Sequence, residues 1–308
     1  MKKIFSLNIL LFLLLGLVWS GSFINIKIAV ENFPPVFSAL IRVLIAFLCL
    51  TFLFLLQRKV ILVSLKDGWR LWVTGFFTQA LPFALLFYGE RSVAPALASI
   101  LNSTVSIWAL ILGTFFFRDV SQWTPNKMIG LFLGFLGVIF IFLPMLELGK
   151  GSVTGTVSIL GMAISYAIGG LLNQHWVFAK MKTSIETNLW QQHLASVVFL
   201  SLISVSIEHW PSYTLFLNIK IIGAFLYLGV LATAVAWILY FYLIKQWDAV
   251  RASSVMYIVP VLAILWDYLF LHLIPSWNQT IGAAAILSGV IMIQWARKKG
   301  NDGHAKST

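Results

Sequence analysis

Gly75–Tyr88 reads GFFTQALPFALLFY, and Gly229–Tyr242 reads GVLATAVAWILYFY. Both stretches begin with glycine, end with Phe-Tyr and are apolar between. The likeness continues outward, with Ala94–Ser99 matching Ala249–Ser254, and Trp123–Ile141 matching Trp277–Ile293 with a small gap. Segments that recur in one order at a nearly constant separation indicate an internal duplication. The alternative is a chance likeness, because apolar runs align easily.

The composition around these stretches is that of a membrane protein. Of the 308 residues, 60% are hydrophobic and 10% are charged, against roughly 45–50% and 25% in soluble proteins. Taking about 20 apolar residues per bilayer crossing, we predict an all-α integral membrane protein with ten transmembrane helices. Their predicted ranges are 5–26, 34–56, 71–89, 93–116, 128–145, 155–179, 187–206, 219–244, 250–271 and 279–296.

The duplication divides these helices into two sets of five. Residues 1–146 form the first predicted repeat, residues 151–296 the second, and residues 297–308 a cytoplasmic tail. Because each repeat holds an odd number of helices, the second copy enters the membrane from the opposite side, so the repeats are inverted. Two such halves can rock about a site near the bilayer midplane, which favours a transporter over a structural anchor.

The loop charges predict the orientation. With the N-terminus inside, the basic residues other than Arg42 fall on the cytoplasmic side, except for Lys27, Arg91, Lys150 and Lys220. This asymmetry follows the positive-inside rule, so both termini are expected in the cytoplasm. The net charge of +11 is spread over short loops, so it does not indicate a nucleic-acid partner.

Several chemistries lack their sequence signals. There is no Walker loop, no H-E-x-x-H and no G-x-S-x-G, and the five histidines lack metal-ligand spacing. The single cysteine, Cys49, excludes an intrachain disulfide and a cysteine zinc site. We therefore expect no enzymatic activity, no metal and no cofactor.

Several segments resemble a known family, the drug/metabolite transporter superfamily, and within it the group with paired EamA domains. The resemblance covers nearly the whole chain. The segments that carry it are Leu17–Phe23 (LVWSGSF), Pro35–Ala46 (PVFSALIRVLIA), Ala84–Ser99, Tyr227–Tyr242, Ala249–Pro260 and Gly282–Ile293. It implies ten helices, inverted repeats, a central substrate cavity and, in many relatives, export of amino acids or other small metabolites across the bacterial cytoplasmic membrane.

One motif of the family is missing. Many relatives carry Gly-Glu where the fourth helix of each half ends, whereas this chain has Phe117-Arg118-Asp119 and Leu271-His272-Leu273. A role for those glutamates therefore does not transfer to this chain.

Two ionisable residues lie inside predicted helices. Arg42 is roughly 12 Å from the start of its helix, so it is a candidate for binding an anionic solute group or for holding helix ends. The alternative is that its side chain reaches toward the outer interface or pairs with Glu31 or backbone carbonyls. Asp267 is the only acidic residue well inside a predicted helix. It is a candidate for proton coupling, and the alternative is a hydrogen bond or cap near the outer end of its helix.

Polar and aromatic residues at mid-depth are the remaining candidates for binding a solute. Ser99, Asn102, Ser103 and Ser106 form one helical stripe, which either contacts the solute or packs against another helix. A cavity that uses both rings and amides suits a small solute with apolar and polar parts. The predicted substrate-binding residues are Trp19, Ser22, Arg42, Gln79, Asn102, Ser103, Tyr166, Asn173, Trp237, Tyr240 and Tyr257.

These features predict a secondary active transporter in the bacterial inner membrane, most simply an exporter of an amino acid or related metabolite that works by alternating access. An importer or exchanger of a small or nucleoside-like solute, and a lipid-modifying membrane enzyme, are the alternatives. The expected partners are the solute, the lipid bilayer and protons, with the chain a monomer or a homodimer.

Overall fold

The computed structural model describes residues 2–58, 65–93, 95–119, 123–145, 152–210, 218–272 and 274–295, and within these ranges it contains helices and no strand. In the first half the elements are α1 (Lys2–Ser20), α2 (Ser22–Asn32), α3 (Pro35–Leu56), α4 (Leu65–Gly75), η1 (Phe76–Ala80), α5 (Leu81–Glu90), α6 (Pro95–Ser103), α7 (Val105–Phe117), α8 (Pro125–Phe142) and η3 (Leu143–Met145). In the second half they are α9 (Val153–Leu172), η4 (Asn173–Phe178), α10 (Ile185–Ile207), α11 (Ile219–Leu226), η6 (Tyr227–Val235), α12 (Ala236–Gln246), α13 (Ala249–Ser253), α14 (Val255–Leu271) and α15 (Trp277–Trp295).

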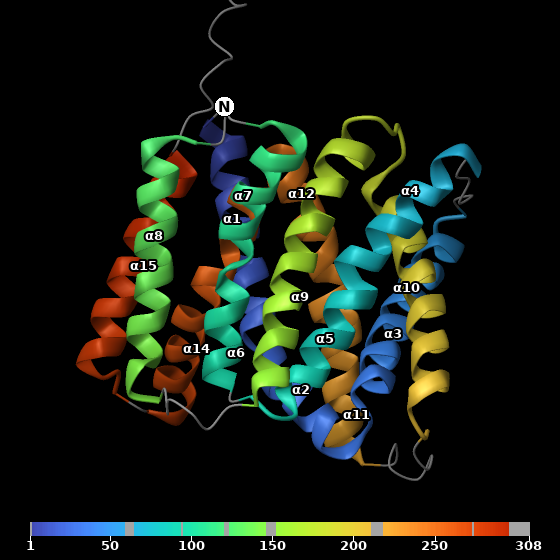
Figure 1. The fold of residues 1–308 in the computed structure, drawn as a ribbon, viewed down its shortest axis with the longest axis horizontal. Helices are drawn as coiled ribbons and strands as arrows, with labels where there is room; N and C mark the ends of the chain where they lie inside the picture. The colour runs from blue at the N-terminus through green and yellow to red at the C-terminus, as the bar shows by residue number, and fades with distance from the viewer. Residues whose placement is uncertain are drawn as a thin grey trace, which may run out of the picture.

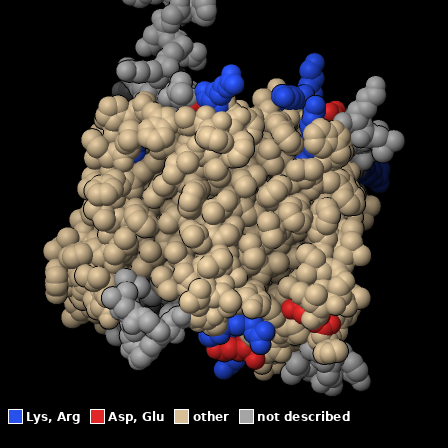
Figure 2. Space-filling model, viewed as in Figure 1, with Lys and Arg blue, Asp and Glu red and all other residues tan. Residues whose placement is uncertain are grey.

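The helices run between two ends of the molecule (Figure 1). In the part of the chain that the structure describes, eight helical segments are long and apolar enough to cross a membrane: Leu7–Asn32, Pro35–Leu56, Asp67–Glu90, Leu97–Phe117, Pro125–Phe142, Val153–Phe178, Ile185–Ile207 and Ile219–Gln246. They correspond to the first eight predicted spans. A shorter apolar helix, Ala249–Leu265, corresponds to the ninth, and α15 occupies the tenth. Figure 2 shows charged residues gathered toward the two ends of the face in view.

Helix starts follow the local sequence. Thr124, Ser152 and Ser184 each accept a hydrogen bond from a backbone N–H in the first turn of α8, α9 and α10. A side-chain oxygen at this position satisfies an N–H group that has no partner inside the helix. Pro35 and Pro125 stand at the first helical position of α3 and α8, where a missing N–H costs nothing.

Three predicted helices are broken where they were expected to be continuous. The breaks fall at Gly21, Thr104 and Ser254, between α1 and α2, α6 and α7, and α13 and α14. The hydroxyls of Ser20, Thr104 and Ser254 donate to the backbone carbonyl three residues earlier, at 2.7, 2.6 and 2.7 Å. Such bonds compete with the helical hydrogen-bond pattern, and hydropathy alone does not reveal them.

The two matching stretches quoted first share an irregular backbone. η1 and η6 are π-helical segments, and η1 aligns with part of η6 in the repeat. The glycine that opens each stretch packs against a helix of the other half. A Cβ on Gly75 would lie 2.7 Å from the Gln192 carbonyl oxygen in α10, and one on Gly229 would lie 2.5 Å from Ile45 Cβ in α3. The duplicated sequence thus makes the same kind of contact twice.

Helices α8 and α15 lie side by side along most of their length (Figure 1). A Cβ on Gly130 would lie 2.5 Å from the Gly289 carbonyl oxygen, and one on Gly137 would lie 2.7 Å from that of Gly282. In the sequence match, Gly130 corresponds to Gly282 and Gly137 to Gly289. The counterparts of the residues in the Gly130–Gly289 contact are therefore the residues of the Gly282–Gly137 contact, as a two-fold relation between the helices requires.

Candidate functional site

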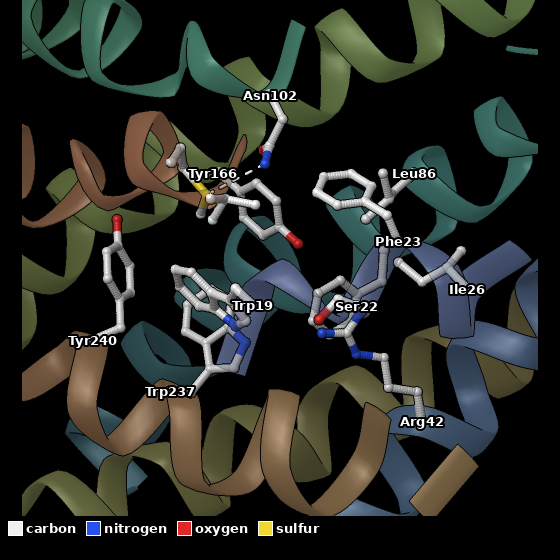
Figure 3. Close-up of a pocket in the computed structure, with 13 residues that line it drawn as sticks. Trp19, Ser22, Phe23, Ile26, Arg42, Leu86, Asn102, Tyr166, Trp237 and Tyr240 are labelled. Carbon is white, nitrogen blue, oxygen red and sulfur yellow. Dashed lines mark hydrogen bonds between the residues drawn. The ribbon is translucent and has the colours of Figure 1, made fainter. Parts of the chain in front are cut away.

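Side chains from both halves converge on a central cavity of about 40 Å³ (Figure 3). Seven of the predicted binding residues line it: Trp19, Ser22, Arg42, Asn102, Tyr166, Trp237 and Tyr240. The other lining residues are Phe23, Ile26, Phe83, Leu86, Met256 and Val259. A water molecule needs roughly 10–15 Å³ measured in this way, so the cavity has room for a few waters and no larger solute.

The helix breaks are placed beside this cavity. Trp19 and Ser22 flank the break at Gly21, Asn102 precedes the break at Thr104, and Met256 follows the break at Ser254. Discontinuous helices that meet at mid-depth are a common construction for a transport site.

One wall of the cavity is aromatic. The Trp237 ring lies 5.4 Å from that of Tyr240, 5.9 Å from that of Tyr166 and 6.1 Å from that of Trp19, between centroids. Phe83 meets Trp237 edge-on at 6.3 Å. These distances are the usual ones for favourable aromatic pairs, so the rings form one connected surface that can hold an apolar or planar group.

Arg42 places a positive charge at the edge of this aromatic wall. Its Nε donates to Thr233 Oγ1 at 2.7 Å and its Nη2 donates to the Ala232 carbonyl oxygen at 3.1 Å. Both acceptors belong to η6, and Trp19 Nε1 donates to the same Ala232 oxygen. The guanidinium carbon lies 4.1 Å from the centroid of the Phe83 ring. The predicted hold by backbone carbonyls is thus present, and it fixes Arg42 in the cavity wall.

Three buried polar atoms of the cavity wall have no hydrogen-bond partner among the residues that the structure describes. They are Ser22 Oγ, Asn102 Oδ1 and Trp237 Nε1. A buried polar atom without a partner costs free energy. A solute that supplied one donor and one acceptor at these positions would recover that cost.

Four predicted binding residues do not line the cavity. Gln79 and Asn173 belong to a second buried polar cluster, in which Gln79 bonds to His193 and the Gln192 amide donates to Asn173 Oδ1 at 2.9 Å. Ser103 donates to the Ile100 carbonyl oxygen of its own helix, at 2.6 Å. Tyr257 is fully buried and its ring lies against Gly134.

The polar stripe of the fourth predicted helix divides between the two roles expected for it. Asn102 lines the cavity and its Nδ2 donates to Met256 Sδ at 3.3 Å. Ser106 instead accepts a hydrogen bond of 3.0 Å from Ser253 of the other half, which is a packing contact. The side chain of Asp267, the predicted proton carrier in α14, lies outside the part that the structure describes.

Three buried charged residues in the described part of the chain have no counterpart in the sequence-based expectations. Lys127, assigned to a cytoplasmic loop, lies in the first turn of α8 and forms a 3.0 Å ion pair with Asp248, with both side chains at most 3% exposed. Glu90, assigned to the junction after the third predicted helix, is 1% exposed. Asp267 is therefore not the sole acidic residue to consider at depth. The only feature of the sequence that could have indicated their burial is that both Glu90 and Lys127 border long apolar runs.

Comparisons with known proteins agree with this architecture. The EamA-like transporter family matches residues 6–143 and again residues 153–295. The chain belongs to the EamA-like transporter family. It is 26% identical to the uncharacterized transporter YoaV of Bacillus subtilis over 90% of this chain and 92% of that protein. It is 30% identical to an uncharacterized transporter of Buchnera aphidicola subsp. Schlechtendalia chinensis, over 90% and 87%.

A further relative carries a more specific name. The chain is 25% identical to a probable amino-acid metabolite efflux pump of Salmonella typhimurium, over 90% of this chain and 91% of that protein. A solved crystal structure shares the fold with a TM-score of 0.73 at 18% identity, over 93% of this chain and 96% of that one. The family and the apolar helices together make this chain a multi-pass membrane protein and a transporter.

Proposed function

We propose that this chain is a secondary active transporter that exports a small metabolite, an amino acid or a related compound, across the bacterial cytoplasmic membrane by alternating access. The observation that carries the proposal is the central cavity, which takes its walls from both matched halves and combines an aromatic surface with the Arg42 charge. Ten spans arranged as inverted repeats, 1–146 and 151–296, with both termini cytoplasmic, are part of the proposal. The reciprocal glycine contacts between α8 and α15 support it.

The cavity chemistry defines the kind of solute. Arg42 suits a carboxylate or another anionic group, because a charge-assisted hydrogen bond is stronger than a neutral one. The rings of Trp19, Tyr166 and Trp237 suit an apolar or aromatic body. Ser22 and Asn102 remain for an amine or hydroxyl group. A compact metabolite with a carboxylate, a polar group and an apolar side chain meets all three requirements.

Alternating access accounts for the small volume of the cavity. At about 40 Å³ the cavity is too small for a metabolite, so a solute enters only when the two halves move apart at one end of the molecule. Polar contacts join the two halves at both ends of the molecule. Lys127 of the first half pairs with Asp248 of the second, and Glu208 of the second half accepts hydrogen bonds from the Val36 and Phe37 N–H groups that begin α3, at 2.9 and 2.8 Å. To open, either end must break its polar contact, which is the Lys127–Asp248 ion pair at one end and the Glu208 hydrogen bonds at the other.

The direct test is transport by the purified protein. Proteoliposomes are loaded with an equimolar mixture of amino acids and common metabolites, a pH gradient is imposed, and the external medium is analysed by mass spectrometry. Selective efflux of compounds that carry a carboxylate supports the proposal. The proposal fails if no compound leaves faster than from protein-free liposomes loaded with the same mixture, and if none of the compounds raises the Tm of the protein.

The orientation has its own test. Reporter proteins fused after residue 146 and after residue 297 are expected on opposite faces of the membrane, outside and inside respectively. Finding both reporters on the same face would rule out the five-plus-five inverted arrangement.

A further inference from the structure

Glu90 is a buried acidic residue that does not line the central cavity and takes part in none of the contacts described there. It is the last residue of α5, its side chain is 1% exposed, and neither carboxyl oxygen has a hydrogen-bond partner in the described part of the chain. An ionised carboxylate in such a place is costly, because it has lost water and gained no partner in return. As buried in this structure, the carboxyl group is therefore favoured in its protonated form.

The position of Glu90 relates it to the transport site. Phe83, Leu86 and Glu90 stand at helical spacings of three and four, so they share one face of α5. The first two line the central cavity. On the other side of Glu90, Arg91 lines a second cavity of about 410 Å³, together with Val30 and Glu208. Glu90 thus lies in the partition between the central cavity and this second, outer cavity. Helix α5 ends at the side of the molecule opposite the start of α1 (Figure 1).

The charged groups around Glu90 act on it from a distance. Helices α2, α3, α6 and α9 and segment η1 pack against α5. The positive charges of Arg42 in α3 and Lys27 in α2 favour the ionised carboxylate, but burial opposes it more strongly. In α9, the charge of an ionised Glu90 would disfavour ionisation of Tyr166. Lys27 already pairs with Glu31 at 3.7 Å. Segments α6 and η1 contain no ionisable residue.

We propose that Glu90 is the proton-binding residue that couples this transporter to the pH gradient. The inference rests on the proposed transport function. When the molecule opens outward, the solute leaves and water from the outer cavity reaches Glu90, which takes a proton from the outer side. The neutral carboxyl group can then be buried again, so the empty carrier closes and returns. When the molecule opens inward, water in the central cavity stabilises the carboxylate, Glu90 releases the proton to the cytoplasm, and the solute-loaded carrier turns outward without it. One proton thus enters for each solute that leaves.

Infrared spectroscopy tests the site without a known solute. The purified protein at pH 7, in a detergent that has no carbonyl group of its own, is expected to show the carbonyl stretch of a protonated carboxylic acid. Glu90→Gln should remove this band and keep the shape of the residue. Glu186→Gln, the same change at an exposed position in the first turn of α10, and Asp267→Asn should leave the band in place. A band that survives in Glu90→Gln, or one that disappears in Asp267→Asn, overturns the assignment.

Transport of the amino-acid mixture tests the coupling. In Glu90→Gln, efflux driven by a pH gradient should fall by about tenfold or more, because the carrier has lost its titratable group. Exchange of labelled for unlabelled amino acids at equal pH should continue, since that cycle needs no net proton movement. Unchanged gradient-driven efflux in Glu90→Gln refutes the inference and leaves the transporter intact. A wild-type protein that moves nothing refutes the transport function, while the infrared band still reports on Glu90.

Discussion

Ser22 and Ser196 are both buried serines, but their hydroxyls are in opposite situations. Ser22 Oγ has no partner in the cavity wall, whereas Ser196 Oγ donates to the Gly75 and Gln192 carbonyl oxygens at 3.0 and 2.7 Å. Ser22→Ala should therefore leave the Tm unchanged or slightly raised. It should weaken solute binding by about 3- to 10-fold, the effect of one neutral hydrogen bond.

Ser196→Ala is the matched control for that change, and it should lower the Tm while leaving solute affinity near that of the wild type. Thermal unfolding in detergent and solute binding by tryptophan fluorescence measure the two effects. A Ser22→Ala variant that loses stability but keeps its affinity would remove Ser22 from the binding site.

Arg42 is expected to decide the preference for anionic solutes. Arg42→Gln removes the charge, so binding of a carboxylate-bearing solute should weaken by about 10- to 100-fold, as expected for the loss of a hydrogen bond to a charged group. A solute analogue that carries an amide in place of the carboxylate should lose less. Lys180→Gln, which removes an exposed positive charge, should change neither affinity. An equal loss for the acid and the amide in Arg42→Gln would mean that Arg42 only holds η6 in place.

At the scale of helices, the close packing of α8 against α15 depends on glycines that have no side chain at the contact. Gly130→Ala would place a methyl group 2.5 Å from the Gly289 carbonyl oxygen, so the helices must separate. We expect a loss of about 1–3 kcal/mol in the free energy of unfolding, typical of overpacking. Gly282→Ala, at the corresponding position of the other half, should lose a similar amount, because it meets Gly137 in the same way.

Gly223→Ala provides the control for these changes, since a Cβ there meets nothing within 4 Å inside α11. It should gain about 0.4–1 kcal/mol from the better helix propensity of alanine. Urea-dependent unfolding in mild detergent measures all three variants. Gly130→Ala with wild-type stability would contradict the close packing of α8 on α15.

The Lys127–Asp248 pair joins the start of α8 to the start of α13. Asp248 also accepts a hydrogen bond of 2.9 Å from the Arg251 N–H, so it caps α13 as well as pairing with Lys127. Lys127→Met leaves Asp248 buried without its ion-pair partner, which should cost about 3–5 kcal/mol. The double variant Lys127→Met with Asp248→Asn, which keeps a capping side chain, should recover most of this loss. Equal stability of the single and double variants would show that the buried charge is not the cause.

For the whole molecule, the sequence was sufficient for the features that follow from periodicity and composition. Long apolar runs predicted the helical segments, and the stretches beginning at Gly75 and Gly229 predicted a duplication that proves to include matched π-helical segments. Depth within a helix was enough to select Trp19 and Trp237 for the cavity. These properties are local, so they can be read along one chain.

Features that depend on contacts between distant helices were not accessible in the same way. Asn173 and Asn102 have similar depth and chemistry, but only Asn102 faces the cavity, because the neighbouring helices decide where each side chain points. The burial of Glu90 and Lys127 likewise comes from packing across the halves. Hydropathy placed both at helix ends, where charged residues are usually exposed.

Access to the cavity from both faces of the membrane is the central claim, and one cysteine at Ser22 can test it. Cys49, the only native cysteine, is first replaced by serine, and Ser22→Cys is then labelled in oriented vesicles with a membrane-impermeant maleimide added to one side at a time. Alternating access predicts labelling from each side, slowed from both sides by a transported solute. Labelling from one side only, whether or not a solute is present, would contradict alternating access through this cavity.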